Sequence, residues 1–383
     1  MVLFPDDRLR RRTSGSRKGR VGTALLGIAL VGAVGFSLVP SPYVIEQPGP
    51  VFNTLGTVTA GEKKVPMISI PTEKTYPTSG SLDLLTVNFV GNRSHLPNWF
   101  EVISAWFDPS QAVVPLDSVY PPGESVKQAD EVAAIQMSNS QKDAIAAALI
   151  HLGKSVPSTV TVAALAPKSP SSGILKAGDV ILTVDGDPVE DVTALRAAIA
   201  GSGAGNPLTI GIRRGSDTLD VSVVPELSGG AKPVPVIGIE AAVDYQFPFN
   251  VSIELQNVGG PSAGQMFALG IIDKLTPGAL TGGASIAGTG TITSAGAVGP
   301  IGGIRQKLYG ASHAGAKWFL APTANCGEVV GHIPDGLTVL AVSNLADSVA
   351  AVTAIGTDGD TRALPTCENA VKATARAPLS VGP

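Results

Sequence analysis

One serine of this chain stands at the junction of a predicted strand and a predicted helix, and this junction constrains the fold more than any other segment. Residues 251–255 (Val-Ser-Ile-Glu-Leu) read as a strand, residues 259–264 (Gly-Gly-Pro-Ser-Ala-Gly) as a tight turn, and Met266 to Leu275 as an apolar helix. Glycines let the backbone approach a substrate carbonyl, and free N–H groups at a helix start can stabilise an oxyanion. Ser262 is therefore a candidate nucleophile. The turn residues beside the oxyanion position are Gly260, Pro261 and Ala263.

Two other interpretations fit the turn alone. In the first, Pro261 and Ser262 simply begin the helix. In the second, Gly260 to Gly264 is the Gly-x-Ser-x-Gly nucleophile elbow, whose owners use a serine, then an acidic residue, then a histidine in chain order. The second interpretation requires His313 or His332, but the chain that follows the serine is too short to complete an ordinary hydrolase sheet.

Further glycine-rich segments follow the turn in a fixed order. They are residues 287–293 (Ala-Gly-Thr-Gly-Thr-Ile-Thr), 298–308 (Val-Gly-Pro-Ile-Gly-Gly-Ile-Arg-Gln-Lys-Leu), 314–317 (Ala-Gly-Ala-Lys) and 320–322 (Leu-Ala-Pro). Together with the Gly-Pro-Ser-Ala-Gly turn, these segments resemble the proteolytic domain of the Lon-type peptidase family. The resemblance implies that Ser262 is the nucleophile, that Lys307 is its general base, and that the Thr289 hydroxyl supports the pair. It therefore implies a serine endopeptidase that forms an acyl-enzyme.

A lysine acts as a base only when its amine is neutral. Because the ordinary lysine pKa is about 10.4, burial has to lower the pKa of Lys307 toward neutrality, at a cost of roughly 4 kcal/mol. Small and apolar neighbours can provide such an environment: Gly302, Gly303, Ile304 and Leu308. Without the surrounding motif, Lys307 would read as a solvated charge on a helix beside Arg305.

Two departures from the ATP-dependent members of the family stand out. Those members usually carry a glutamate where Thr291 stands, and they have an attached ATPase. Residues 153–155 (Gly-Lys-Ser) end like a phosphate-binding loop, but the pattern needs a glycine at Ala148, inside a predicted helix from Asp130 to Leu152. We therefore predict an enzyme that needs neither ATP nor any other cofactor. The whole chain resembles the smaller bacterial group that joins a membrane anchor, a PDZ domain and a Lon-like peptidase domain.

A compact unit from about Ser158 to Glu226 resembles a bacterial protease-associated PDZ domain. The resemblance rests on Gly178-Asp179-Val180-Ile181 and on Val184-Asp185-Gly186. PDZ domains bind an extended peptide as an added strand on a sheet edge. We expect the groove between a strand at Val160 to Ala163 and a helix at Val192 to Ala200, where it would recruit polypeptide substrates. The glycine-rich carboxylate-binding loop of the family is not evident before this strand, so internal segments are candidate ligands as well as C-termini.

The N-terminus combines a basic cluster with an uncharged run. Seven Arg and Lys residues lie between Arg8 and Arg20, and Val21 to Val39 carries no charge. A helix of that length spans roughly 28 Å, close to a bilayer core, and the positive-inside rule keeps the basic end in the cytoplasm. We predict a single-pass anchor in the cell membrane, with the later domains extracytoplasmic. The alternative is a cleaved signal peptide with small residues Ala33 and Gly35 before the cut.

Composition and cysteine usage argue against a nucleic-acid-binding protein and against a zinc protein. The net charge is −4, and 15% of the residues are charged, which leaves no basic surface for a nucleic-acid partner. Two cysteines, Cys326 and Cys367, are too few for a zinc cluster, so no metal is expected. They are a candidate disulfide if this part is exported, and otherwise two unrelated thiols.

The predicted fold is α+β and multidomain, with a transmembrane helix, a β-rich PDZ-like domain and a Lon-type α/β proteolytic domain. Residues 41–153 are an extracytoplasmic region of strands and a helix, and a candidate first part of the peptidase fold into which the PDZ unit is inserted. The family resemblance implies a ring, usually hexameric. A catalytically silent PDZ-type adaptor on a peptidase scaffold is the alternative function. The expected boundaries are a cytoplasmic tail at 1–20, the anchor at 21–40, the region at 41–153, the PDZ domain at 154–227, the proteolytic domain at 228–356 and a C-terminal tail at 357–383.

Overall fold

The computed structural model describes residues 21–22, 25–27, 36, 39–120, 125–166, 168–189, 191–228 and 233–376. The predicted basic tail and most of the predicted anchor therefore lie outside the described residues, as does the end of the C-terminal tail. Within the described ranges, none of the helices is both long enough and apolar enough to span a bilayer.

Two compact units make up the described chain. The smaller unit combines residues up to Gln47 with Phe89–Val126, and the larger combines Pro48–Asn88 with the chain from Lys127 onward. In the smaller unit, the first residues of β1 pair antiparallel with β6, from Tyr43 opposite Pro115 to Glu46 opposite Ala112. Its elements are the start of β1 (Tyr43–Asn53), the end of β5 (Ser81–Val90), α2 (Trp99–Trp106), β6 (Ala112–Pro115) and α3 (Leu116–Val119).

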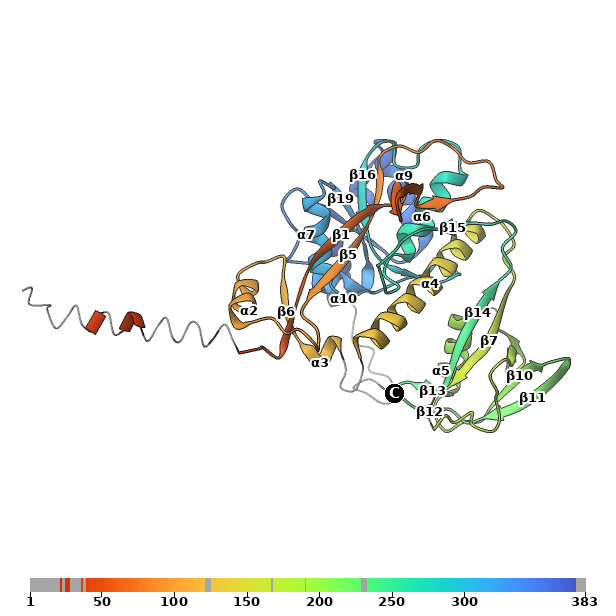
Figure 1. Ribbon diagram of the computed structural model, residues 1–383. Coiled ribbons are helices and arrows are strands. Elements are labelled where there is room, and N and C mark those ends of the chain that lie inside the picture. Colours follow the sequence, from red (N-terminus) through yellow and green to blue (C-terminus); the bar gives the residue numbers. More distant parts are fainter. Residues whose placement is uncertain are drawn as a thin grey trace, which may run out of the picture. The chain divides into compact units, whose positions relative to one another are not determined.

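A largely parallel sheet organises the larger unit, in the order β20-β19-β16-β5-β1 (Figure 1). Strand β16 pairs in parallel with β5, which precedes the PDZ-like segment, and with β19, which follows it. Strands from both sides of that segment therefore share one sheet. Its later strands are β16 (Ser285–Gly288), β19 (Trp318–Pro322) and β20 (Thr338–Val342), and the short pairs around it are β2 (Thr57–Ala60) with β3 (Lys63–Pro66), β4 (Ile68–Ser69) with β15 (Ser252–Ile253), and β17 (Thr291–Ile292) with β18 (Val298–Gly299).

Successive residues of a strand point to opposite faces of a sheet. Both faces of this sheet carry apolar residues, and helices cover both of them. Ile286 and Leu320 pack with one set of helices, whereas Ala287 and Phe319 pack with the other. The first set is α4 (Val126–His151), α6 (Gly264–Leu275) and α9 (Leu345–Gly356), and the second is α7 (Ile304–His313), α8 (Cys326–Val329) and α10 (Cys367–Arg376). A disulfide joins Cys326 of α8 to Cys367 of α10. Ten consecutive residues of α6 are buried, so this helix runs through the core beside the sheet.

The PDZ-like segment forms its own antiparallel sheet, in the order β11-β10-β8-β7-β14. The buried Asp179 carboxylate links two of its turns, because Arg214 donates to both carboxylate oxygens at 2.7 and 2.6 Å. These hydrogen bonds hold the pKa of Asp179 below its usual value. The elements are β7 (Ser158–Leu165), β8 (Val180–Val184), β9 (Asp187–Pro188), α5 (Val192–Ser202), β10 (Leu208–Arg214), β11 (Asp217–Val223) and β14 (Ile239–Tyr245), with β12 (Glu226–Leu227) paired to β13 (Pro235–Val236) nearby in the chain.

The expected position of the peptide groove needs correction. Strand β14 pairs with β7 along its length, from Ile239 opposite Leu165 to Tyr245 opposite Ser158. The edge of β7 that was expected to receive a peptide is therefore already occupied by the chain itself. The edge strand on the β7 side of the sheet is β14, which follows the main run of PDZ-like sequence and which no local pattern assigned to this sheet.

Candidate active site

The turn before α6 places Ser262 at the start of a buried helix. Gly260 has φ +84°, a left-handed conformation that favours glycine, and Ala263 is the N-cap residue without a side-chain cap. A Cβ atom on Gly264 would lie 2.8 Å from the Ile292 side chain, so glycine is required for this close packing. Ser262 itself is half-buried. The turn is thus held rigidly while its serine stays accessible.

Lys307 reaches Ser262 from α7. Its Nζ lies 2.7 Å from Ser262 Oγ and 2.9 Å from Thr289 Oγ1, and the residue is 2% exposed. No carboxylate of the described residues forms an ion pair with this amine. Burial without a counter-ion disfavours the charged form, and it lowers the pKa of Lys307 to about 7. A large share of Lys307 is therefore neutral near physiological pH.

Thr289 connects Lys307 to the backbone of Ser262. The Thr289 hydroxyl donates to the Ser262 carbonyl at 2.9 Å, so its oxygen is free to accept an N–H from Lys307 Nζ. The Gly290 N–H donates to the same carbonyl. A neutral amine has two N–H groups and one lone pair. With one N–H directed at Thr289, the lone pair can face the Ser262 hydroxyl.

The three turn residues predicted beside the oxyanion position differ in what they can donate. The Gly260 N–H already donates to the Ala133 carbonyl at 2.9 Å. Pro261 has no backbone N–H. The N–H groups of Ala263 and of Ser262 itself have no acceptor within the described part of the chain. Of the predicted set, Ala263 is thus the residue with a free donor.

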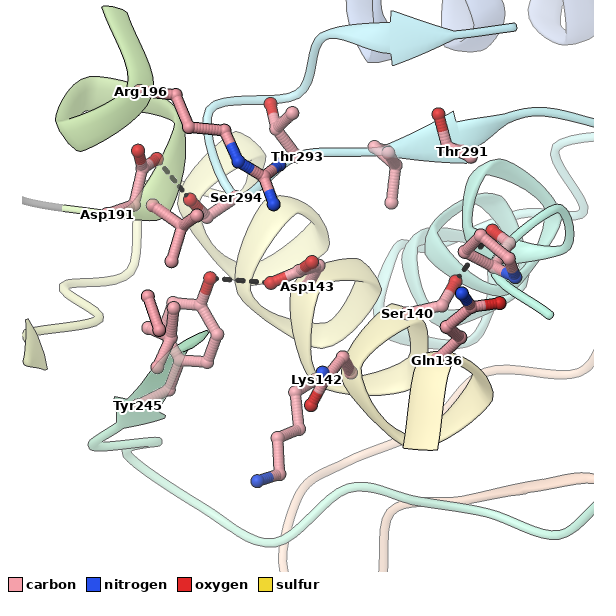
Figure 2. A pocket seen from close by; sticks show the side chains of 16 residues that line it. Gln136, Ser140, Lys142, Asp143, Asp191, Arg196, Tyr245, Thr291, Thr293 and Ser294 are labelled. Carbon is pink, nitrogen blue, oxygen red and sulfur yellow. Dashed lines mark hydrogen bonds between the residues drawn. The ribbon is translucent and has the colours of Figure 1, made fainter. Parts of the chain in front are cut away.

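A pocket of about 370 Å³ adjoins the nucleophile turn and was not foreseen from the sequence (Figure 2). It lies between α4, the N-terminal half of α5, strand β14 and the segment from Thr291 to Ser294, and Pro261 forms part of its wall. Thr291, noted above for its departure from the family pattern, lies here. In described residues no three His, Cys, Asp or Glu side chains come together as a metal site.

Two hydrogen bonds cross this pocket (Figure 2). The Tyr245 hydroxyl donates to Asp143 at 2.7 Å, and the Ser294 hydroxyl donates to Asp191 at 2.6 Å. Burial raises the pKa of Asp143, and the neighbouring Asp191 raises it further, while the Tyr245 hydrogen bond opposes the change. Asp143 directly precedes the buried run of α4 at residues 144–149, and a charged residue at this position is the signal by which the sequence could have indicated it.

Two segments of the chain match known protein families. Residues 257–354 match the family described as Lon protease (S16) C-terminal proteolytic domain, and residues 127–224 match the PDZ domain. The chain is thus a mixed α/β multidomain protein that carries a PDZ domain and a Lon-type serine peptidase domain. The predicted resemblance is confirmed for both domains.

Curated relatives agree with this assignment. Lon protease 2 of Herpetosiphon aurantiacus is 31% identical over 160 residues, which cover 40% of this chain and 19% of the relative. Lon protease 1 of Bacillus subtilis is 32% identical over 114 residues, which cover 28% of this chain and 14% of the relative. The chain thus spans less than a fifth of the length of these relatives. Among solved structures, the PDZ domain of an SdrC-like protein from Listeria innocua is 26% identical, over 22% of this chain and 92% of that chain, with a TM-score of 0.20.

Proposed function

We propose that the protein is an ATP-independent, membrane-tethered serine endopeptidase in which Ser262 and Lys307 form a catalytic dyad. The observation that carries the proposal is the 2.7 Å separation of Lys307 Nζ from Ser262 Oγ. A buried amine with a pKa of about 7 has the basicity that proton abstraction at neutral pH requires. The Lon-type domain supports the same reaction class.

The dyad can carry both halves of peptide hydrolysis. Lys307 takes the proton from Ser262 Oγ as the oxygen attacks the carbonyl carbon, and the carbonyl oxygen becomes the oxyanion. The ammonium then gives its proton to the departing amine as the C–N bond breaks, which leaves an ester on Ser262. In the second half, Lys307 takes a proton from water, hydroxide attacks the ester, and the proton returns to Ser262 Oγ. Thr289 keeps the amine oriented throughout.

The PDZ domain would recruit the polypeptide substrate along the open edge of β14. Gln246 N–H donates to the Pro157 carbonyl beside β7, so the two-residue period of the strand turns the main-chain groups of Val243 and Tyr245 toward the open edge. Unpaired groups on an edge strand can bind an extended peptide as a further strand. Val243 and Tyr245 of β14 line the same pocket as Pro261, so this pocket adjoins both the strand and the turn of Ser262.

Two parts of the proposal, the membrane tether and the independence from ATP, are supported by the amino-acid sequence. The basic cluster and the uncharged run support a single-pass anchor, and they support an extracytoplasmic position for the peptidase. The disulfide between Cys326 and Cys367 agrees with an oxidising compartment. No segment of the 383 residues has the phosphate-loop pattern that ATP binding would need.

Cleavage of an unfolded protein tests this function. The full chain, reconstituted in lipid vesicles, is incubated with a denatured substrate protein without nucleotide and with a chelator. We expect cleavage by the parent and by the control Lys317→Ala, whose lysine is exposed, and none by Ser262→Ala or Lys307→Ala. Equal cleavage by all four would refute the dyad. If the parent is inactive and does not react with an acylating probe, the silent adaptor becomes the better account.

A further inference from the structure

Ser140 is a buried hydroxyl on α4 that contacts the nucleophile turn. It is 3% exposed, and it lies on the face of the helix that also buries Met137 and Ala144. Its hydroxyl donates to the Pro261 carbonyl at 2.9 Å, across 121 positions of sequence (Figure 2). Burial of a hydroxyl in an apolar setting is unfavourable unless it is hydrogen-bonded. The bond to Pro261 therefore keeps both partners in place.

The position of this carbonyl also determines the direction of the next N–H group. The described chain contains no cis peptide bond, so the Pro261 C=O and the Ser262 N–H point in opposite directions from one peptide plane. Because Ser140 holds the carbonyl toward α4, the Ser262 N–H points away from α4. No residue of the described chain accepts a hydrogen bond from this N–H.

The following peptide plane is fixed in the same way. The Ser262 carbonyl accepts from the Thr289 hydroxyl and from the Gly290 N–H, both at 2.9 Å. The Ala263 N–H points in the opposite direction within that plane, and it has no acceptor in the described part of the chain. Each carbonyl that flanks the nucleophile is thus anchored, and each corresponding N–H is left available. Free N–H groups at the nucleophile are the donors that an acyl-transfer oxyanion needs.

Helix α4 contacts the turn at a second point, two helical turns earlier. The Gly260 N–H donates to the Ala133 carbonyl, and a Cβ atom on Gly259 would lie 2.6 Å from Ala133 Cβ. A Cβ atom on Gly264 would lie 2.9 Å from Ser140 Oγ. The turn therefore packs directly against α4. This helix lies outside residues 257–354, the segment that matches the Lon-type domain.

We propose that Ser140 is a positioning residue for the peptidase reaction. Through the Pro261 carbonyl, it fixes the peptide plane between Pro261 and Ser262, and it thereby keeps the Ser262 N–H directed for hydrogen bonding to the oxyanion. The inference rests on the proposed function of Ser262. The Ser140 hydroxyl bonds to the Pro261 carbonyl, whereas the Lys307 amine bonds to the hydroxyls of Ser262 and Thr289, so loss of the Ser140 hydroxyl should affect the oxyanion side of the reaction.

The test compares Ser140→Ala with Ser138→Ala, an exposed serine on the same helix, in the full chain in vesicles. A fluorogenic peptide reports kcat and KM, and a peptide aldehyde, which forms a tetrahedral adduct with Ser262, reports the binding of an oxyanion mimic. Because removal of a direct oxyanion donor costs about 100- to 1,000-fold, we expect a loss of about tenfold in kcat for loss of positioning alone. Aldehyde affinity should fall by a similar factor, with KM and the pH midpoint unchanged. Ser138→Ala should match the parent.

Several results would overturn the inference. One is a kcat for Ser140→Ala equal to that of the parent; another is a loss of kcat without any loss of aldehyde affinity. A third is a fall in activity that matches the fraction of protein that is unfolded, measured by thermal melting and active-site titration on the same samples. An active parent with an unaffected Ser140→Ala variant refutes positioning but leaves the dyad intact. A parent that neither cleaves nor binds the aldehyde refutes the proposed function itself.

Discussion

Lys307 Nζ lies 2.7 Å from Ser262 Oγ, and the lysine that carries it is 2% exposed. The two side chains come from different elements, helix α7 and the turn before α6, and no acidic group of the described chain neutralises the amine. Burial therefore favours the neutral form of this amine at the expense of stability.

Replacement of Lys307 by methionine should abolish cleavage and stabilise the fold. The folded-state pKa of about 7 lies below the unfolded value near 10.4, so the unfolded chain binds more protons between these pH values. The parent therefore gains stability from this residue's titration as pH rises from about 7 to 10. At pH 7, Lys307→Met should gain roughly 2–4 kcal/mol in free energy of unfolding, measured with denaturant. A less stable Lys307→Met variant would argue against a neutral buried amine.

Loss of the Thr289 hydroxyl should slow acylation without preventing folding. Thr289→Val keeps the shape, but it removes the acceptor for Lys307 and one donor to the Ser262 carbonyl. Loss of about 1–2 kcal/mol of transition-state stabilisation predicts a fall in kcat of about 5- to 30-fold, measured with a fluorogenic peptide. Thr338→Val, at an exposed position of strand β20, is the control. Unchanged kcat in Thr289→Val would remove Thr289 from the mechanism.

The charge pair inside the PDZ sheet should be structural. Asp179→Asn leaves Arg214 without its partner, and breaking a buried pair typically costs about 3–5 kcal/mol. Because Arg214 is 30% exposed, we expect about 2–3 kcal/mol here, seen as earlier proteolysis of the PDZ segment. The depressed pKa of Asp179 adds a pH dependence: its contribution is present above the ordinary carboxyl pKa and is lost as pH falls through the folded value. Asp217→Asn, on an exposed strand, should have no effect.

Reduction of the disulfide should loosen the end of the proteolytic domain. Cys326 and Cys367 are 41 positions apart, and closing a loop of that length stabilises a fold by about 4 kcal/mol in the chain-entropy account. We expect Cys326→Ser, Cys367→Ser and the double variant to lose the same stability, because each removes the one bond. A double variant that is markedly less stable than either single variant would show that the cysteines act separately.

Peptide binding should depend on the open edge of β14. Val243 lines the pocket, and its main-chain groups face that edge. Val243→Pro removes an N–H that an added strand would use, and it should weaken the binding of a fluorescent substrate peptide at least tenfold. The rate at which a small acylating probe modifies Ser262 should stay unchanged. Leu219→Pro, on the distant strand β11, tests whether the effect is a general disruption of the sheet.

The sequence predicted local elements well and non-local pairings poorly. The helix predicted from Asp130 to Leu152 corresponds to α4 (Val126–His151), and the predicted helix that begins at Val192 is confirmed as α5. Both have clear periodicity within one segment. The pairing of β14 with β7 was missed, because its register depends on residues about 80 positions apart and its short strand carries no distinctive alternation.

The same distinction holds at the site. Ser262, Thr289 and Lys307 belong to spaced motifs, so a resemblance could assign them before the structure brought them within hydrogen-bonding distance. Ser140 and Asp143 belong to no motif. Their roles arise from how α4 packs against segments more than 100 positions away, which only the folded chain brings together.

The pH dependence of Ser262 acylation tests the central claim most directly. The full chain in vesicles is mixed with an activated ester, and the single-turnover rate is measured from pH 5 to 9 while intact mass spectrometry locates the adduct. We predict an adduct on Ser262 whose rate rises with a midpoint near pH 7, because Lys307 must lose its proton first. Lys307→Ala should lose this rate, and Lys317→Ala should keep it. An adduct that forms equally fast in Lys307→Ala, or a rate that does not change across this range, would contradict the Ser262/Lys307 dyad.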